Sequence, residues 1–282
     1  MIQWSQIPDR AAVREGILST SVALKEYAHA NPKETGVGLG LATAGLLLWY
    51  YGADLRHRYF AWINNKFADL KQEDYDNFKK TAFAALKDLA SHDPKLREEK
   101  TLRILEIGAG VGANFIMYPD NTRLVVADPN PHFEQYFKDH KAKFPHIKCE
   151  TVIIAKGEDI DMVRSESIDA VVTTLVLCSV DDIAKVVSQI KRVLVPGGKY
   201  IFVEHIKEWD RKNHWMRRHI QNILTWSGFW PFTFDGCYLN RNPQPIIEAV
   251  GFSDVKVERE YAPMPAAFMM VAAPHLKGVA TK

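Results

Sequence analysis

The residues with the clearest chemical meaning in this chain are two acids and three glycines. Glu106 shortly precedes the glycines Gly108, Gly110 and Gly112. Asp128 lies 18 residues beyond Gly110, close to the roughly 20-residue interval of a ribose-binding acid. Glycine lets the backbone turn sharply and approach a ligand, because it has no Cβ to clash. A carboxylate one strand later can accept both hydroxyls of a ribose. The spacing therefore predicts a nucleotide-cofactor site.

The glycine loop by itself fits two cofactors. Its G-x-G-x-G pattern suits S-adenosylmethionine, but with Ala113 it also matches the G-x-G-x-x-A form of a dinucleotide fingerprint. Glu106 favours S-adenosylmethionine, because a carboxylate there would repel a diphosphate and attract the ammonium of a methionine group.

These residues need a parallel sheet to position them. The apolar run 102–107 is typical of a buried strand, and 123–128 is the next such run. We expect further strands at 148–154, 168–174 and 199–204, helices at 132–143, 158–164 and 181–194, and a final strand pair at 255–261 and 267–272. This alternation predicts an α/β fold with a mostly parallel sheet, helices on both faces and ligands at the carboxyl ends of the strands.

The motifs continue beyond Asp128 with Gly157-Glu158, Asp169-Ala-Val-Val and Leu194-Val-Pro-Gly-Gly198. This series resembles the class I S-adenosylmethionine-dependent methyltransferases, a Rossmann-like fold whose last strand is antiparallel. One branch is more similar still, the membrane-associated alkyl thiol S-methyltransferases of the endoplasmic reticulum and lipid droplets. The matching strings are Gly-Ala-Asn114-Phe115, Asp128-Pro-Asn130-Pro131, Thr174-Leu-Val-Leu-Cys178-Ser-Val180, Glu204-His205 and Phe234-Asp235-Gly236-Cys237. The resemblance covers 101–282 well and 35–100 loosely.

The resemblance implies a role for each matching residue. The three glycines would hold the methionine end of the cofactor, with Glu106 and Asn114 in the same set, and Asp128 would bind the ribose. Pro129 and Asn130 would shape the adenine wall, Gly157 and Glu158 would contact the adenine edge, and Thr174 and Leu175 would lie beneath the sulfonium. Two residues differ from the pattern of the family. Ala109 stands where close relatives often carry cysteine, and Lys156 stands where many members have an acid. Lys156 makes a backbone group the expected partner of the adenine amino group.

The reaction implied by the resemblance is methyl transfer to the sulfur of a small lipophilic thiol. Such an in-line displacement depends mainly on alignment, and a thiol with a pKa of ~8.5 needs only a modest base or local positive charge. We predict His205 as that base, with Asp235 as its partner. The alternative for His205 is a structural, hydrogen-bonded histidine, and we interpret Cys178 and Cys237 as structural. O- or N-methylation of a lipid or quinone and a non-enzymatic lipid-droplet role remain alternative functions.

Composition limits the other functions. With 282 residues, 47% hydrophobic and 25% charged, the chain can bury one sizeable α/β core and carry an N-terminal segment. A net charge of +2 argues against nucleic acid as a partner. The 10 histidines lack metal-ligand spacing and the 3 cysteines are far apart, which predicts neither a metal site nor a disulfide framework. We expect a reducing compartment and no obligate protein partner.

The N-terminal region predicts a membrane anchor. Residues 35–53 carry no formal charge, and as a helix they would span about 28 Å, close to the ~30 Å hydrocarbon core of a bilayer. Arg56, Arg58 and Lys66 follow, which favours a catalytic domain facing the cytosol. A buried core helix is the alternative. We therefore divide the chain into an amphipathic or irregular helix (1–34), an anchor (35–55), a helical lid and linker (56–100) and a methyltransferase domain (101–282).

The segment 207–234 combines aromatic and basic side chains. Trp209, Trp215, Trp226 and Trp230 lie there among several lysines and arginines. Such a segment forms either an apolar wall for the acceptor or a helix that lies on anionic lipid. With the predicted anchor, this segment favours a membrane surface, and the family resemblance implies that the surface is the endoplasmic reticulum membrane or the lipid droplet.

Overall fold

A computed structural model describes residues 22, 25–69 and 73–282 of the chain. The chain divides into two compact units, residues 1–55 and 56–282. The predicted helical lid (56–100) and methyltransferase domain (101–282) therefore both lie within the second unit.

The long helix α2 (Pro32–Asp69) begins at Pro32, and proline is tolerated in the first turn of a helix. Residues 25–30 are helical and Asn31 is not, while most of the amphipathic or irregular helix expected over 1–34 lies outside the described residues. The predicted anchor at 35–55 forms part of α2. In the described part of the chain, no helix combines the length and the apolarity that crossing a membrane requires.

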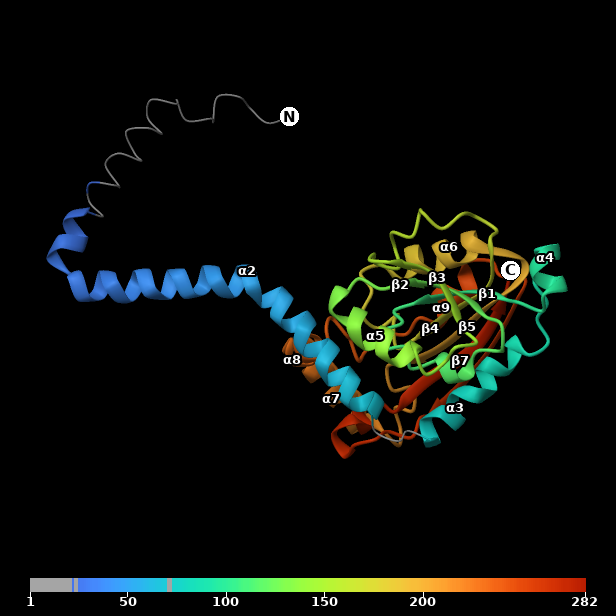
Figure 1. Cartoon of the computed structure of the whole chain (residues 1–282). Helices are drawn as coiled ribbons and strands as arrows, with labels where there is room; N and C mark the ends of the chain where they lie inside the picture. Colours follow the sequence, from blue (N-terminus) through green and yellow to red (C-terminus); the bar gives the residue numbers. More distant parts are fainter. Residues whose placement is uncertain (1–21, 23–24, 70–72) are drawn as a thin grey trace, which may run out of the picture. The chain divides into compact units, whose positions relative to one another are not determined.

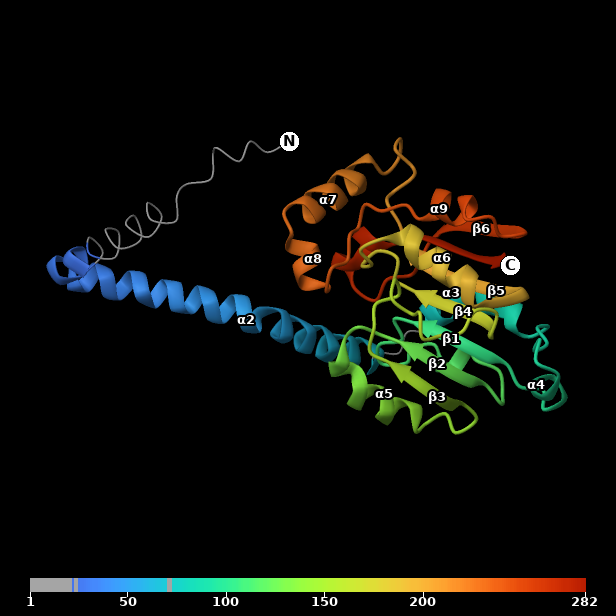
Figure 2. The same cartoon turned by 90° about the horizontal axis from the view of Figure 1, so that it is seen from above.

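The second unit is built on one seven-stranded sheet (Figures 1 and 2). Its strands, in the spatial order β3-β2-β1-β4-β5-β7-β6, are β1 (Arg103–Ile107), β2 (Arg123–Ala127), β3 (Lys148–Ile153), β4 (Ile168–Thr174), β5 (Leu194–His205), β6 (Asp254–Tyr261) and β7 (Pro274–Thr281). β1 to β5 pair in parallel, and β7 runs antiparallel to both β5 and β6. The predicted parallel sheet with an antiparallel last strand is confirmed.

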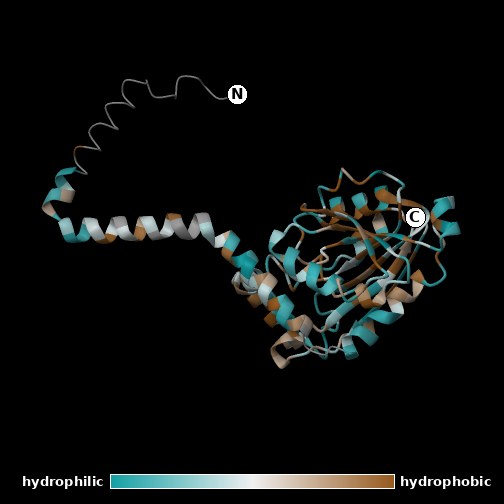
Figure 3. Ribbon diagram, viewed as in Figure 1, coloured by the Kyte–Doolittle hydropathy of each residue, from teal (hydrophilic) through white to brown (hydrophobic). Residues whose placement is uncertain are grey.

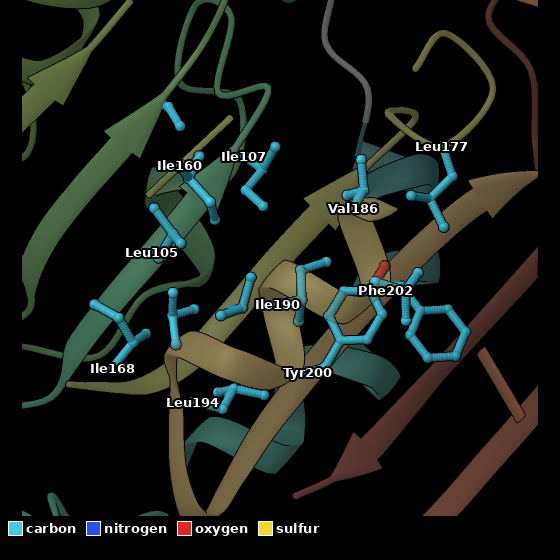
Figure 4. Packing of buried hydrophobic residues seen from close by; sticks show 14 of the residues in the cluster. Leu105, Ile107, Ile160, Ile168, Leu177, Val186, Ile190, Leu194, Tyr200 and Phe202 are labelled. Atoms are coloured by element: carbon cyan, nitrogen blue, oxygen red, sulfur yellow. The ribbon is translucent and has the colours of Figure 1, made fainter. Parts of the chain in front are cut away.

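Apolar side chains cover both faces of this sheet, because the residues of a strand point alternately to either side. Leu105, Val171 and Phe202 pack on one face with Val186 and Ile190 (Figure 4). Their neighbours Ile104, Val172 and Ile201 pack on the other face with Phe83 and Leu86. Figure 3 shows the strands mostly brown between helices with teal outer surfaces, which is the pattern of a three-layer α/β unit.

Helices supply the two outer layers. α3 (Glu73–Phe83) and η2 (Ala84–Leu86) lie on one face, whereas α6 (Ile183–Val193) and α9 (Gln244–Ala249) lie on the other. Asp182 caps the start of α6, because its carboxylate accepts the backbone N–H of Lys185 at 3.0 Å. The remaining helices are α4 (Pro94–Glu98), η3 (Phe115–Met117), η4 (Pro131–Phe133), α5 (Glu134–Lys141), α7 (Trp215–Trp226), α8 (Phe229–Thr233) and η5 (Ala267–Ala272).

The helix predicted at 158–164 is wrong. The segment forms turns instead, and Arg192 of α6 binds two of its carbonyl groups, those of Ile160 at 3.0 Å and Val163 at 2.8 Å. Glu158 meanwhile accepts backbone N–H groups from the loop before α6. These tertiary hydrogen bonds replace the ladder that a helix would form.

The last strand lies later than predicted. Residues 267–272 form η5, and the strand β7 begins at Pro274. The run Ala-Phe-Met-Met-Val-Ala is apolar but does not alternate and has little β-branching, whereas Leu276 alternates with the polar residues His275 and Lys277 in β7. Proline is tolerated at Pro274 because it is the first residue of the strand.

Candidate S-adenosylmethionine site

The glycine loop lies directly after β1 and adopts a backbone that favours glycine. The φ angles are +68° at Gly108, +53° at Gly110 and +82° at Gly112. A Cβ atom at Gly108 would come within 2.5 Å of Val176, and one at Gly112 within 2.2 Å of the Phe115 ring. Larger residues at these two positions would force the neighbours apart, so glycine is needed for space as well as for conformation.

Asp128 closes the loop from the adjacent strand. Its Oδ2 accepts the Gly110 N–H at 2.9 Å, and its Oδ1 accepts the Asn130 N–H at 2.9 Å. The parallel register of Ile107 with Ala127 brings these residues together. Burial raises the pKa of Asp128, although the two backbone hydrogen bonds oppose that rise. Each carboxylate oxygen keeps one lone pair for a further donor, such as a ribose hydroxyl.

Glu106 provides a buried carboxylate with an unused oxygen. The side chain is 1% exposed; Oε1 accepts Asn114 Nδ2 at 2.8 Å, and Oε2 has no hydrogen-bond partner. Burial raises the pKa of Glu106 to about 7, against the opposing effects of Tyr118, Asn114 and Lys79. A buried acceptor without a partner is costly, so this oxygen suits a cationic donor such as the ammonium of S-adenosylmethionine.

Asn114 connects three parts of the site. Its Nδ2 donates to Glu106 and also to Thr174 Oγ1 at 3.0 Å, while its Oδ1 accepts from the Lys79 ammonium at 3.0 Å. The amide of this predicted cofactor residue is therefore engaged within the protein, where it fixes Glu106.

Lys79 was not predicted as a site residue. It lies on α3, is 2% exposed, and also donates to the Ala113 carbonyl at 3.3 Å and to Asp76 at 3.2 Å. Burial lowers its pKa. A lysine four residues after Tyr75 and three before Ala82, on the apolar stripe of a predicted helix, is the signal that could have revealed it.

Pro129 and Asn130, predicted at the adenine wall, follow Asp128 at the end of β2. Pro129 is exposed, and Asn130 is buried. Asn130 caps η4 by accepting the His132 N–H at 3.0 Å, and it donates to the His57 carbonyl of α2 at 3.0 Å. Asn130 thus attaches the part of α2 within the second unit to this edge of the sheet.

Gly157 and Glu158, predicted at the adenine edge, lie after β3. A Cβ at Gly157 would approach Ile107 at 3.0 Å, so this turn packs closely against β1. Glu158 Oε1 accepts the N–H groups of Asp181 at 2.7 Å and Asp182 at 3.1 Å. Lys156 pairs with Asp181 at 2.6 Å. The Glu158 carboxylate thereby holds the loop that leads into α6.

Thr174 and Leu175, predicted beneath the sulfonium, end β4 at the same edge as the glycine loop. Thr174 contacts Asn114, as described above, whereas Leu175 is 40% exposed and has φ +58°. The left-handed region is unfavourable for leucine, and the Leu175 N–H is held by the Val203 carbonyl of β5 at 3.0 Å. The strand pairing therefore maintains a strained backbone beside the cofactor loop.

His205 and Asp235 do not form the predicted pair. His205 Nε2 lies 3.0 Å from Cys237 Sγ, and its Nδ1 is buried without a partner. Asp235 Oδ1 instead contacts Arg56 Nε at 3.1 Å and His57 Nε2 at 3.3 Å. The backbone turns between Asp235 and Cys237, where Asp235 has φ +45° and Gly236 has φ +87°.

Cysteine side chains surround His205. Cys178, which follows β4, and Cys237 are both buried, and their sulfur atoms and a nitrogen of His205 all lie within 4.8 Å of one another. The interaction with Cys237 and burial raise the pKa of the Cys178 thiol well above its ordinary value. Trp230 Nε1 donates to Cys237 Sγ at 3.3 Å. The wide sequence separation of these residues concealed the cluster from spacing arguments.

Two hollows lie elsewhere. One of about 260 Å³ and one of about 400 Å³ share Arg103, at the start of β1, and Ser167, which precedes β4. They are thus at the amino ends of these strands, whereas the glycine loop and Asp128 follow the carboxyl ends.

Comparison with known proteins agrees with this geometry. A model of the methyltransferase domain family matches residues 105–202. Human thiol S-methyltransferase TMT1A is 32% identical over 80% of this chain and 86% of its own length, and human TMT1B is 34% identical over 79% and 86%.

Solved structures share the fold at low identity. A methyltransferase of Thermotoga maritima that depends on S-adenosylmethionine gives a TM-score of 0.51 at 15% identity, over 79% of this chain and 98% of its own. Phosphoethanolamine N-methyltransferase 2 of Haemonchus contortus, in complex with S-adenosylmethionine, gives 0.51 at 15% identity over 73% and 52%. The chain therefore belongs to the family of S-adenosylmethionine-dependent methyltransferases that includes TMT1A and TMT1B, and S-adenosylmethionine is its methyl donor.

Proposed function

We propose that this enzyme methylates the sulfur of small lipophilic thiols at a membrane surface. The observation that carries the acceptor assignment is the 32–34% identity, over most of both chains, to relatives named thiol S-methyltransferases. The buried His205 at the end of β5, close to the glycine loop edge, supports it by supplying a group that can assist a thiol.

The cofactor side of the site rests on two acids. When bound, S-adenosylmethionine supplies an electrophilic methyl group on a sulfonium. Glu106 would accept its ammonium through the free Oε2, and Asp128 would accept the ribose hydroxyls through the lone pairs that Gly110 and Asn130 leave unused. Asn114 would hold Glu106 in place through its hydrogen bond to Oε1, and Lys79 would support Asn114 through its own hydrogen bond.

The acceptor side needs a group that promotes loss of the thiol proton. The thiolate is the nucleophile, and an ordinary thiol with a pKa of ~8.5 is mostly protonated at neutral pH. His205 Nδ1 is buried without a hydrogen-bond partner, so it is free to accept a proton from an acceptor thiol. If the proton leaves just before methyl transfer, the reactive thiolate forms only when the acceptor and S-adenosylmethionine are already aligned.

The membrane assignment rests on an exposed apolar surface. Six side chains of α7 and α8, which lie next to each other in Figure 2, are each more than half exposed. These residues, here named the aromatic ridge, are Trp215, Met216, Ile223, Trp226, Phe229 and Phe232. Contiguous exposed apolar side chains of this kind mark protein or membrane contacts, and tryptophan prefers the membrane interface.

Positive charge beside the aromatic ridge favours lipid over a protein partner. Arg211 and Lys212 are exposed just before α7. Arg217 is less available, because it pairs at 2.8 Å with the fully buried Glu208. A basic, tryptophan-rich surface fits anionic lipid headgroups. With the uncharged stretch at 35–53, it supports a location at the cytosolic face of the endoplasmic reticulum or of lipid droplets.

The proposed acceptor is tested by methyl transfer to a panel of acceptors. Labelled S-adenosylmethionine is offered with a small alkyl thiol, a phenol, a quinol and phosphatidylethanolamine, and Asp128→Ala serves as the control variant. We expect transfer to the thiol alone, lost in Asp128→Ala together with cofactor binding. Transfer to the phenol, quinol or amine would instead establish an O- or N-methyltransferase, and full cofactor binding by Asp128→Ala would contradict the assigned ribose site.

A further inference from the structure

The cluster around His205 has the composition of a metal site. Cys178 lies in the loop after β4, His205 ends β5, and Cys237 follows α8, so three separate segments contribute one side chain each. All three are buried at 3%, 5% and 8% exposure, and their potential ligand atoms lie within 4.8 Å of one another. Among the residues that the structure describes, no other group of three or more histidine, cysteine or carboxylate side chains is placed to hold a metal ion.

The donor set points to zinc. Two cysteine sulfurs and one imidazole nitrogen match Zn²⁺, which binds sulfur at about 2.3 Å and nitrogen at about 2.0–2.1 Å in tetrahedral geometry. Those bond lengths place ligand atoms about 3.5–3.8 Å apart. His205 Nε2 and Cys237 Sγ, now 3.0 Å apart, would therefore need to separate by only about half an ångström. Mg²⁺ and Ca²⁺ prefer oxygen ligands, which this cluster lacks.

The surroundings support a bound cation. Trp230 Nε1 donates to Cys237 Sγ at 3.3 Å, and outer-shell hydrogen bonds of this kind orient metal ligands. Glu204, next to His205 and fully buried, has an Oε1 without a partner and adds negative charge when it is ionised; burial raises its pKa to about 7. Arg241 brings one opposing positive charge near His205, which the two thiolates formed on metal binding would outweigh.

We propose that Cys178, His205 and Cys237 bind one zinc ion whose fourth position accepts the acceptor sulfur. Three protein ligands with an open position is the arrangement of catalytic rather than structural zinc. Binding displaces the two cysteine protons to solvent. With Nε2 on the metal, the neutral His205 ring carries its proton on Nδ1, so the zinc takes the place of His205 as the group that lowers the pKa of the acceptor thiol.

The transfer step balances without any further reactant. The acceptor thiol loses its proton to solvent as its sulfur binds the metal. Its sulfur then forms the new bond to the methyl carbon, and the bond from that carbon to the sulfonium breaks with its electron pair on the departing sulfur. The acceptor part of this inference rests on the proposed thiol function; the metal site itself does not.

The metal site is tested on the full-length protein without any acceptor. Purified enzyme, stripped with a chelator under reducing conditions, is titrated with Zn²⁺ and separately with Co²⁺, whose thiolate complexes give a charge-transfer absorption band. We expect one equivalent per chain for the wild type and the appearance of that band. Loss of even an outer-shell partner weakens metal binding about 10- to 100-fold, so Cys178→Ser and Cys237→Ser should each weaken it by at least about 100-fold.

Cys149→Ser is the matched control. Cys149 lies on β3, is half-buried, and stands outside the cluster, so its replacement should leave metal binding unchanged. S-adenosylmethionine binding and circular dichroism establish that each variant is folded. If a variant does not fold, the cobalt spectrum of the wild type still tests the inference. Absence of stoichiometric binding, no thiolate band, or equal loss in Cys149→Ser would overturn it.

Activity measurements separate this inference from the proposed function. Thiol methylation by fully metal-free enzyme would leave the thiol acceptor established and refute the role of zinc in the reaction. Stoichiometric zinc binding without thiol methylation would support the metal site and refute the acceptor. Activity lost on chelation and restored by Zn²⁺ but not by Mg²⁺ is the result that we expect.

Discussion

The ammonium of Lys79 lies 3.0 Å from Oδ1 of Asn114, so a buried cation on α3 supports the amide that holds Glu106. This contact joins a helix outside the motif series to the centre of the cofactor site. It also provides positive charge that opposes the rise in the pKa of Glu106. The site is therefore tuned by a residue that does not need to touch the cofactor.

Lys79→Met should shift the pH dependence of cofactor binding. Glu106 must be ionised to attract an ammonium, and its pKa is raised to about 7, so affinity for S-adenosylmethionine should fall as the pH drops through that value. Without Lys79 the pKa of Glu106 rises further, and the midpoint moves to higher pH. A shift of one unit would lower the ionised fraction of Glu106, and hence binding, about fivefold at pH 7 and about tenfold well below it. Calorimetric titration between pH 6 and pH 9 measures this.

The exposed neighbour Lys80 offers a control for that experiment. Lys80→Met removes the same charge from α3, but its ammonium contacts Asn77 and not the glycine loop. It should leave the midpoint where the wild type has it. Identical midpoints for all three proteins would show that Glu106 is not coupled to Lys79 during binding.

Gly112→Ala should destabilise the fold more than the equivalent change at Gly197. Both glycines have φ near +80°, at +82° and +76°, so both substitutions incur the left-handed penalty of roughly 1–2 kcal/mol. Only Gly112 has no room, since a Cβ would lie 2.2 Å from the Phe115 ring, whereas nothing lies within 4 Å at Gly197. Overpacking of this kind adds about 1–3 kcal/mol. Urea unfolding of both variants provides the comparison, and equal losses would mean that Phe115 moves aside freely.

The local parts of the site could be predicted from the sequence, and the tertiary parts could not. The glycine loop and Asp128 belong to one strand–turn–strand unit, so spacing alone brings Gly110 to Asp128. The cluster of His205 with Cys178 and Cys237 depends on how three loops fold over the sheet edge, which no periodicity encodes. For Lys79, the helical spacing with Tyr75 and Ala82 indicates burial, but its contact with Asn114 depends on how α3 packs on the sheet. The helix expected at 158–164 failed because Arg192, distant in sequence, supplies competing hydrogen bonds.

Asp235→Ala should weaken the attachment of α2 without changing the titration of the catalytic step. Asp235 contacts Arg56 and His57 of α2 and is not paired with His205. The partly exposed ion pair is worth about 0.2–1 kcal/mol. Arg56→Ala should cost a similar amount, and the double variant should cost less than the sum of the two changes. A profile of kcat/KM against pH with a displaced midpoint in Asp235→Ala would revive the predicted pair with His205.

Replacing two side chains of the aromatic ridge should reduce binding to anionic vesicles. Trp226 and Phe232 are 78% and 69% exposed, so their loss removes apolar surface that costs the fold little. Burial of one large apolar side chain is worth about 1.5–3 kcal/mol, and we expect roughly tenfold weaker binding for each change, Trp226→Ala and Phe232→Ala. Sedimentation of the full chain with phosphatidylcholine vesicles containing phosphatidylserine measures the binding.

Met162→Ala is the control for these variants. It removes an equally exposed apolar side chain, at 66%, from the loop between β3 and β4, and this variant should bind like the wild type. Binding should also weaken with added salt, because Arg211 and Lys212 face the anionic headgroups in this proposal. If both ridge variants bind as tightly as the wild type while deletion of residues 1–55 abolishes binding, the N-terminal segment alone carries the membrane contact.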